Sequence, residues 1–461
     1  MSQISRRIYP LDPRELTEEQ LAVVFAMTSR NPESFDNIAK IVSAEKAANF
    51  HERWVLNYGH ASVAEHAILH MAVENISRLA CDTLEDNRLA SYTEKSSRYQ
   101  LLDRGHYYIP QEIKPGREMD LYTGTCDYLF QSYEEILDGL LVYLANITPR
   151  DPEERSASYN LRLRRIATDS CRFLLPAATL TNVGITINAR SMEHAIRKLL
   201  SSNLIEEQEI GEALKSQGRT ITPTLIKYAD KNEYLVLTRD AQNHIQRPDS
   251  IPDSYSDCQA KLVHSDSLAQ SKLVSALIYR FSSQTYEQIW ETVQNMDDIQ
   301  MEEVIDRCLN ELGPHDIPVR ELETVDYTFD MVMDYGAYRE FKRHRMQTYI
   351  AQPLTTNLGF IVPELIQDAG LEQSFSKAME KSNEAFSAIA ESLPEVAQYL
   401  VTHAHLRRSL CKINLRECYH LFKLRTSPQA HFTLRRVMNQ AMNLVTKRHP
   451  LLFKHLKIRT D

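Results

Sequence analysis

Two segments of the chain alternate apolar with polar residues, which is typical of half-buried strands. The alternation runs through residues 66–74 in the first half and through residues 325–331 in the second half. Each segment leads into a short helical stretch and then into a tripeptide that carries basic residues, at 86–88 and at 343–345. The pattern therefore predicts the same strand, helix and basic turn on both sides of the chain.

A second feature also occurs twice, in the same order after the first. The tetrapeptides INAR (Ile187–Arg190) and INLR (Ile413–Arg416) each open a stretch with apolar residues at helical spacing. Two ordered features that recur in this way indicate an internal repeat. The first half has more residues between its two features, and we place the excess around residues 128–158 as added helix and loop.

Long stretches of helix formers fill much of the rest, and glycine is scarce, with 12 residues. These helical stretches are residues 16–54, 265–295 and 372–408. Residues 240–257 are polar, hold two prolines and lack apolar periodicity, which predicts a linker. We therefore expect a first unit at residues 1–238, a linker at 239–257 and a second unit at 258–461.

The composition is that of an ordinary globular protein, with 43% hydrophobic and 25% charged residues in 461. No apolar run is long enough to span a membrane, and the first residues lack the apolar core of a secretory signal. The seven cysteines form no CxxC pair, which favours reduced thiols and a cytoplasmic location.

The net charge of −9 argues against binding nucleic acid through its phosphate backbone. Local basic clusters nevertheless occur at residues 343–345 and 407–408. On an acidic background such a cluster suits an anion pocket, and the alternative is a solvated helix face. Three consecutive cationic or hydrogen-bonding groups at 343–345 suit a diphosphate better than a single carboxylate.

The densest polar stretch is residues 87–99, NRLASYTEKSSRY. If this stretch is extended, Glu94, Ser96 and Arg98 point to one side, because alternate side chains of a strand share a face. A hydroxyl and a guanidinium side by side can hold a phosphate, and the carboxylate can accept from a sugar hydroxyl or orient the arginine. The alternative is a solvated edge strand.

A histidine-rich stretch, GHASVAEH at residues 59–66, precedes the first predicted strand. His66 and His70 have the spacing of helical metal ligands, but the alternation places them on a strand and no HExxH motif occurs, so no metal site is predicted. Either histidine can instead contact a ligand or be a satisfied core residue. The sequence also lacks the glycine motifs of Rossmann and P-loop proteins and the GxSxG motif of hydrolases.

Together these motifs resemble those of the flavin-dependent thymidylate synthases. The resemblance rests on GHASVAEH, Ser77–Arg78, NRLASYTEKSSRY, the Arg172 of CRFLLP and INARS, in the order and at the spacing of that family, and it covers residues 15–235. The second half is similar in more eroded form, through its Arg-His-Arg tripeptide at 343–345 and through the helix after INLR, which carries Arg425.

Each half lacks family residues that the other half keeps. The first half has Asp86 and Asn87 in its tripeptide, and Leu199 in place of the helix arginine. The second half has Ala351, Pro353 and Thr355 at the nucleotide seat, and Gln398 where the first half has Arg172. Because family members are homotetramers whose sites combine subunits, such complementary losses suggest one surviving composite site. This interpretation requires the two halves to pack together.

The resemblance implies an α+β fold of two tandem copies of a thymidylate-synthase-complementing unit, each an antiparallel sheet with long flanking helices. It implies a methyltransferase that converts dUMP to dTMP, with FAD as cofactor and with methylenetetrahydrofolate and NADPH as co-substrates, in a homodimer that mimics the family tetramer. Arg425 would be the catalytic residue and would contact dUMP together with Glu94, Ser96, Arg98 and Arg172. The residues expected to hold FAD are His60, Arg88, Asn188, His194, Arg343, His344, Arg345, Asn414 and His420.

Three other functions remain open at this level. The chain could methylate another pyrimidine nucleotide at C5, or it could bind a flavin or nucleotide without catalysis. A purely structural helical scaffold is the third, and it predicts no bound flavin.

Overall fold

The computed structural model describes residues 7–11, 14–98, 100–245 and 254–459. They form two compact units, each assembled from segments that are distant in sequence. Unit 1 comprises Met1–Cys126, Ala177–Ser250 and Ile389–Tyr399; unit 2 comprises Asp127–Pro176, Ile251–Ala388 and Leu400–Asp461. Unit 2 therefore contains a segment of the first sequence half, and unit 1 contains a short segment of the second.

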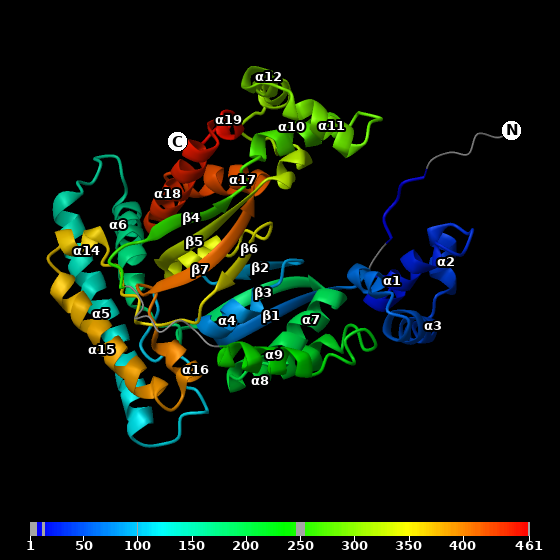
Figure 1. Ribbon diagram of the computed structural model, residues 1–461. Coiled ribbons are helices and arrows are strands. Elements are labelled where there is room, and N and C mark those ends of the chain that lie inside the picture. The colour runs from blue at the N-terminus through cyan, green and yellow to red at the C-terminus, as the bar shows by residue number, and fades with distance from the viewer. Residues whose placement is uncertain (1–6, 12–13, 99, 246–253, 460–461) are drawn as a thin grey trace. The chain divides into compact units, whose positions relative to one another are not determined.

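Unit 1 is organised around a three-stranded antiparallel sheet of order β1-β3-β2 (Figure 1). Its strands are β1 (Ile68–Ser77), β2 (Ala90–Glu94) and β3 (Leu180–Asn188). The other elements that lie wholly in this unit are α1 (Glu18–Met27), α2 (Phe35–Ile41), α3 (Ala44–Phe50), η1 (His51–Asn57), η2 (Ala61–His66), α4 (Arg78–Leu84), α7 (Ala189–Leu200), α8 (Ile205–Gly218), α9 (Glu233–His244) and α16 (Pro394–Ala397).

Unit 2 contains a four-stranded antiparallel sheet of order β4-β5-β7-β6 (Figure 1). Its strands are β4 (Gln259–Ser265), β5 (Asp326–Asp334), β6 (Thr348–Ala351) and β7 (Leu406–Asn414). Its helices are α6 (Ser156–Cys171), η3 (Arg172–Leu174), α10 (Ala269–Tyr279), α11 (Tyr286–Gln294), α12 (Asp298–Leu309), η4 (Arg320–Thr324), α13 (Tyr335–Phe341), α14 (Glu364–Asp368), α15 (Glu372–Ala390, to Ala388), α17 (Leu415–Arg425), α18 (Phe432–Arg448) and α19 (Pro450–Phe453), with α5 (Arg117–Ile147) from Asp127 on.

The two sheets confirm the tandem α+β architecture and the internal repeat. The order β1-β3-β2 recurs as β5-β7-β6, and β4 adds a further edge strand in unit 2. Ile68 pairs with Asn188 in unit 1, and Asp326 pairs with Asn414 in unit 2. In both units the helix that follows β3 or β7 is tied to the start of the paired strand β1 or β5. The N–H of Ala189 donates to the carbonyl of Ala67, just before β1, at 2.9 Å, and the N–H of Leu415 donates to the carbonyl of Val325, just before β5, at 2.8 Å.

A β-bulge distinguishes the first repeat from the second. The register of β1 against β3 shifts between Val73 and Ile76, whereas β5 and β7 pair without a shift. Asn75 within the bulge has a φ of 57° and donates its N–H to Oδ1 of Asn182 at 3.0 Å. Asparagine tolerates this left-handed conformation better than most residues.

The core of unit 1 explains the apolar alternation of its strands. Leu69 of β1 and Ile185 and Ile187 of β3 lie in one buried cluster with Met192 and Ile196 of α7. The sheet therefore buries its apolar face against the helix that INAR opens.

The helix predicted over residues 372–408 is interrupted after Ala390, where α15 ends; helical turns resume at Pro394–Ala397 and Gln398–Leu400, and the prediction is wrong from Leu406, where β7 begins. Leu393 precedes Pro394 and has a ψ of 67°, because a residue before proline is disfavoured in the helical region. Arg407 and Arg408 consequently lie on strand β7 and not on a helix.

Two other helical predictions also need correction. Residues 16–54 form several short helices, with Ser34 and Ser43 at N-cap positions that begin new ones. Residues 259–265 form β4, so the helical stretch expected from 265 begins only at Ala269. In the expected linker, α9 extends as far as His244, and residues 246–253 lie outside the described residues. In the part of the chain that the structure describes, we find no helix that is both long and apolar enough to cross a membrane.

Candidate functional site

A network of charged side chains in unit 2 is centred on Arg425, in the last turn of α17. Nε of Arg425 donates to Nε2 of His344 at 2.9 Å, and its NH1 lies 3.4 Å from Oε2 of Glu340. The Arg425 side chain keeps 22% of its surface exposed. Its NH2 group has no hydrogen-bond partner among the described residues, so this group is available to a ligand.

His344 is buried between Arg425 and Glu417. Its Nδ1 lies 2.9 Å from Oε1 of Glu417, and the two side chains are 4% and 5% exposed. Burial lowers the pKa of His344, with Glu417 opposing and Arg425 reinforcing this shift. The imidazole is therefore neutral at neutral pH and hydrogen-bonds through both nitrogens.

Glu340 of α13 connects Arg425 to Arg172. Oε1 of Glu340 lies 3.9 Å from NH2 of Arg172, and Asp169 lies 3.9 Å from Nε of the same arginine. Arg172 begins η3, directly after α6, and is 6% exposed. Arginines from the two sequence halves thus share one carboxylate within unit 2.

The tripeptide 343–345 forms a turn after α13 in which exposure alternates. His344 is buried, whereas Arg343 and Arg345 on either side are exposed. His420 of α17 is exposed, and its ring meets that of His344 edge-on, with 5.4 Å between the ring centroids. His344 and His420 therefore meet at α17, and Arg343 and Arg345 flank His344 in the turn.

The predicted nucleotide seat lies in unit 1, and its local conformation differs from the prediction. β2 ends at Glu94, so Ser96 and Arg98 are not in an extended segment. A turn forms because the N–H of Arg98 donates to Oγ of Ser96 at 3.2 Å. Both residues are half-buried, and Tyr99, the last residue of the motif, lies outside the described residues.

Glu94 is paired with Arg78, which belongs to the Ser77–Arg78 motif and was not predicted as a site residue. Oε1 of Glu94 accepts from NH1 of Arg78 and from Oγ1 of Thr181, both at 2.9 Å. The side chains of Arg78 and Glu94 are 4% and 5% exposed. Glu94 is therefore fixed within unit 1 by a buried ion pair.

His60 lies at a cavity of about 610 Å³ in unit 1. Trp54 and His66 also line this cavity, and the rings of Trp54 and His60 lie 6.0 Å apart. Arg30 lies over the Trp54 ring at 4.5 Å. The combination of flat rings and a cation suits a planar anionic ligand. His70 instead bonds to Oγ1 of Thr186 at 2.9 Å on β3.

The repeated asparagines begin their helices as N-caps. Oδ1 of Asn188 accepts from N of Ser191, and Oδ1 of Asn414 accepts from N of Glu417, both at 2.8 Å. Capping gives a physical reason for an asparagine at both positions. Of the remaining unit 1 candidates, Arg88 is exposed in the turn before β2 and His194 is exposed on α7.

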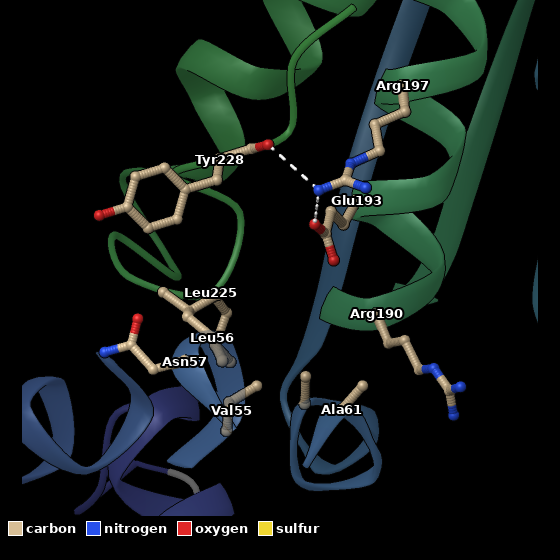
Figure 2. A pocket seen from close by; sticks show the side chains of 10 residues that line it. Val55, Leu56, Asn57, Ala61, Arg190, Glu193, Arg197, Leu225 and Tyr228 are labelled. Carbon is tan, nitrogen blue, oxygen red and sulfur yellow. Dashed lines mark hydrogen bonds and ion pairs between the residues drawn. The ribbon is translucent and has the colours of Figure 1, made fainter. Parts of the chain in front are cut away.

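A second, polar cavity of about 350 Å³ lies beside α7 in unit 1 (Figure 2). Arg197 bonds to Glu193 at 2.7 Å and to the carbonyl of Tyr228 at 3.4 Å (Figure 2). Arg190, which points away from them, pairs with Glu65. Arg197 and Arg190 lie 2.7 Å and 2.5 Å from their carboxylate partners, closer than the 3.4 Å between Arg425 and Glu340, so this cavity is a poorer anion seat than the surroundings of Arg425.

Among the residues that the structure describes, two clusters of side chains have the composition of a metal site: His344, Glu417 and His420 in unit 2, and Cys81, Glu85 and Glu94 in unit 1. In the first, a metal at Nε2 of His344 would have to displace Arg425. In the second, Glu94 already neutralises Arg78. The hydrogen-bond networks therefore account for both clusters better than a metal does.

Glu340 and Glu417, which hold the arginines and the histidine of unit 2, were not predicted from the sequence. A signal existed for Glu417, because it precedes His420 by three positions on one helix, and such residues share a face. Nothing in the sequence pointed to Glu340, whose partners are far away along the chain.

The fold and this network define a tandem-repeat α+β protein with an arginine-rich polar site. The chain belongs to the family of thymidylate synthase complementing proteins, which it matches over residues 14–224 and 261–451. The two matched ranges correspond to the two repeats of the structure.

Relatives fall into full-length and half-length groups. A UPF0159 protein of Chlamydia muridarum is 34% identical over 430 residues, covering 90% of this chain and 81% of the relative. One of Thermoplasma acidophilum is 28% identical and covers 88% of each chain. A flavin-dependent thymidylate synthase of Clostridium tetani is 27% identical over 214 residues, which is 46% of this chain and 82% of that protein.

Among solved structures, the UMP/dUMP methylase PolB of Streptomyces cacaoi bound with 5-Br dUMP covers 44% of this chain and 96% of its own. The identity is 16% and the TM-score is 0.36, so the family assignment stands on the sequence matches alone.

Proposed function

We propose that this protein is a cytoplasmic FAD-dependent enzyme that converts dUMP to dTMP, with methylenetetrahydrofolate as methylene donor and NADPH as reductant. The observation that carries the proposal is the unpartnered NH2 group of Arg425, on a guanidinium whose Nε and NH1 are held by His344 and Glu340. The family includes flavin-dependent thymidylate synthases among its half-length relatives.

Arg425 is the residue that we assign to the pyrimidine ring. A fixed guanidinium polarises a ring carbonyl and stabilises the negative charge that develops as C5 becomes nucleophilic. Arginine keeps its charge although burial lowers the pKa of Arg425, because its ordinary value is so high. The shared carboxylate of Glu340 keeps Arg425 and Arg172 from repelling each other.

We assign the nucleotide phosphate to Arg172, Ser96 and Arg98, with Glu94 at the sugar. Arg172 and Arg98 offer forked donors that match phosphate oxygens, and Ser96 adds a neutral donor. Arg172 lies in unit 2, and the other three residues lie in unit 1.

Bound FAD would supply the redox chemistry of the reaction, and the chain would supply its position. Exposed Arg343 and Arg345 suit its diphosphate, and the cavity at His60 has the flat rings that suit a planar ring system. The other residues proposed to hold FAD are Arg88, Asn188, His194, His344, Asn414 and His420.

The test compares the purified chain with two variants. Wild type should carry flavin absorbance and form dTMP from dUMP only when the folate and NADPH are both present. Arg425→Ala should lose on the order of a hundredfold in kcat. Arg448→Ala is the matched control, because Arg448 also lies in the last turn of a unit 2 helix and is exposed.

The same experiment separates the other functions. A yellow protein that leaves dUMP unchanged but methylates UMP or dCMP would move the substrate to another pyrimidine nucleotide. A yellow protein with no turnover would indicate flavin binding alone, and a colourless one would refute the proposal. Arg343→Ala should lower flavin affinity, and undiminished FAD retention would remove that assignment.

A further inference from the structure

We propose that Glu417 is a positioning residue that fixes Arg425 through the tautomer of His344. The inference rests on the proposed function only in that Arg425 is the ring-directed group. Three side chains are hydrogen-bonded in the order Glu417, His344, Arg425. Oε1 of Glu417 lies 2.9 Å from Nδ1 of His344, and Nε2 of His344 lies 2.9 Å from Nε of Arg425.

The donors and acceptors of this arrangement allow one protonation state. Nε of Arg425 is always a donor, so Nε2 of His344 must offer its lone pair. The proton of the neutral imidazole then lies on Nδ1, where only an acceptor is compatible, and the Glu417 carboxylate is that acceptor. Glu417 thereby selects the tautomer that receives Arg425.

Without Glu417, the tautomer with its proton on Nδ1 loses the hydrogen bond that stabilises it, and only the contact to Arg425 still favours that tautomer. The alternative tautomer carries it on Nε2, where two N–H groups would face each other at the Arg425 contact. Arg425 would then have to leave His344 and would keep only the longer contact to Glu340 at 3.4 Å. The expected consequence is a mobile guanidinium at the ring.

Glu417 is itself held rigidly, as a positioning residue must be. It lies in the first turn of α17, its backbone N–H donates to the N-cap Asn414 at 2.8 Å, and its side chain is 5% exposed. His420 meets the His344 ring edge-on and restricts the ring further.

The first repeat supports the inference independently, because all three members are absent there together. The strand register places Ser191, Asn87 and Leu199 at the positions of Glu417, His344 and Arg425. Asn87 in unit 1 donates instead to the carbonyl of Leu84 at 2.8 Å. The carboxylate and the imidazole occur in the repeat that has the arginine and not in the other.

The test uses full-length Glu417→Ala and Glu417→Gln. Glu417→Ala should lower kcat for dTMP formation on the order of tenfold to a hundredfold, with a smaller change in KM for dUMP, because a displaced group costs turnover. Glu417→Gln should recover most of the activity, because its amide oxygen accepts the same Nδ1–H. It should also move the acid limb of the pH profile to lower pH, because Glu417 raises the pKa of His344.

Tyr327→Phe is the matched control. It removes the hydroxyl that lies 3.0 Å from Nδ1 of buried His449 in the same unit, a group that makes no hydrogen bond to Glu417, His344 or Arg425. It should lower the melting temperature without lowering kcat. A kcat of Glu417→Ala equal to that of wild type would overturn the inference. It would also be overturned if Glu417→Gln were as inactive as Glu417→Ala and its pH profile did not move.

A measurement that needs no turnover separates this inference from the proposed function. In ¹⁵N-histidine spectra, His344, assigned with His344→Asn, should be protonated on Nδ1 in wild type and in Glu417→Gln, and should lose that preference in Glu417→Ala. If His344 of the wild-type protein were protonated on Nε2, or bound a metal through Nε2, the positioning role of Glu417 would be refuted even if the enzyme were active. The expected tautomer in an enzyme that makes no dTMP would refute only the proposed function.

Discussion

Burial and hydrogen bonding together hold His344 in its neutral form. Its Nε2 accepts from Arg425 and its Nδ1 donates to Glu417, while His420 lies against the ring. Protonation would place a proton on Nε2 opposite the guanidinium. The charge state of this one side chain therefore decides whether Arg425 stays in place.

The pH dependence should report this residue. The folded-state pKa of His344 is below its ordinary value of about 6.5, so the unfolded chain binds more protons between the two values. Its contribution to stability is complete above about pH 6.5 and is lost as the pH falls toward the folded pKa. The free energy of unfolding and kcat should both decline in that window.

His344→Asn provides the comparison, since Asn87 occupies the same position in the first repeat. This variant has no titrating group at the position, so its decline in stability between pH 6.5 and the folded pKa should be shallower than that of wild type. Denaturant titrations at several pH values measure this slope, and identical slopes would contradict the assignment to His344.

The ion pair of Arg78 and Glu94 should matter mainly for stability. Arg78→Ala leaves a carboxylate buried without its cation, which typically costs about 3–5 kcal/mol. The additional change Glu94→Gln should return part of this free energy, because the uncompensated charge is then gone. Denaturant unfolding of the two variants measures the difference, and a double variant as unstable as the single one would argue against a charge effect.

At the scale of elements, both repeats use one construction. A strand ends in an asparagine whose side chain caps the helix that follows, at Asn188 and at Asn414. The same cap begins α7 in unit 1, which has Leu199, and α17 in unit 2, which has Arg425. The asparagine cap therefore occurs whether or not the helix carries an arginine at the position of Arg425.

Asn188→Ala should accordingly lower the free energy of unfolding by about 1 kcal/mol, and Asn188→Asp should be nearly neutral, because an aspartate also accepts from the Ser191 N–H. Thermal melts of flavin-free protein keep this effect apart from any change in FAD affinity. Equal melting temperatures for Asn188→Ala and wild type would show that α7 does not depend on its cap.

At the scale of the whole molecule, each compact unit depends on both sequence halves. In unit 2, Phe173 and Leu175 accept backbone hydrogen bonds from Ala404 and His403, both at 3.0 Å. In unit 1, the hydroxyl of Tyr399 donates to Glu206 at 2.7 Å. Each half therefore completes the core of a unit whose sheet belongs to the other half.

A chain divided within residues 246–253 should reveal this dependence. The fragment 254–461 lacks Arg172 and the residues around it, so we expect no cooperative unfolding and no dUMP binding when it is made alone. Co-expression with fragment 1–245 should restore both. Co-purification through a tag on one fragment, with calorimetry for dUMP, measures the result, and a second fragment that melts like the intact chain would contradict the expectation.

The sequence alone was enough to predict the repeat, its strands and the helices that INAR and INLR open. These features are local, because alternation, helical spacing and a capping asparagine act between neighbouring residues. The helix expected over residues 372–408 is interrupted at Leu393, because the residue before a proline is disfavoured in the helical region. The extended conformation expected at Ser96 and Arg98 failed because a side-chain hydroxyl competes for the backbone N–H.

The sequence by itself determined which residues of this protein can carry charge to a ligand, and that each repeat lacks what the other keeps. Only the tertiary structure decided which of them meet. Arg172 and Arg425 come together on Glu340, and Glu417 reaches His344, across long stretches of chain. Spacing along a sequence cannot reveal such contacts, because they depend on how separate helices pack and bury their polar groups.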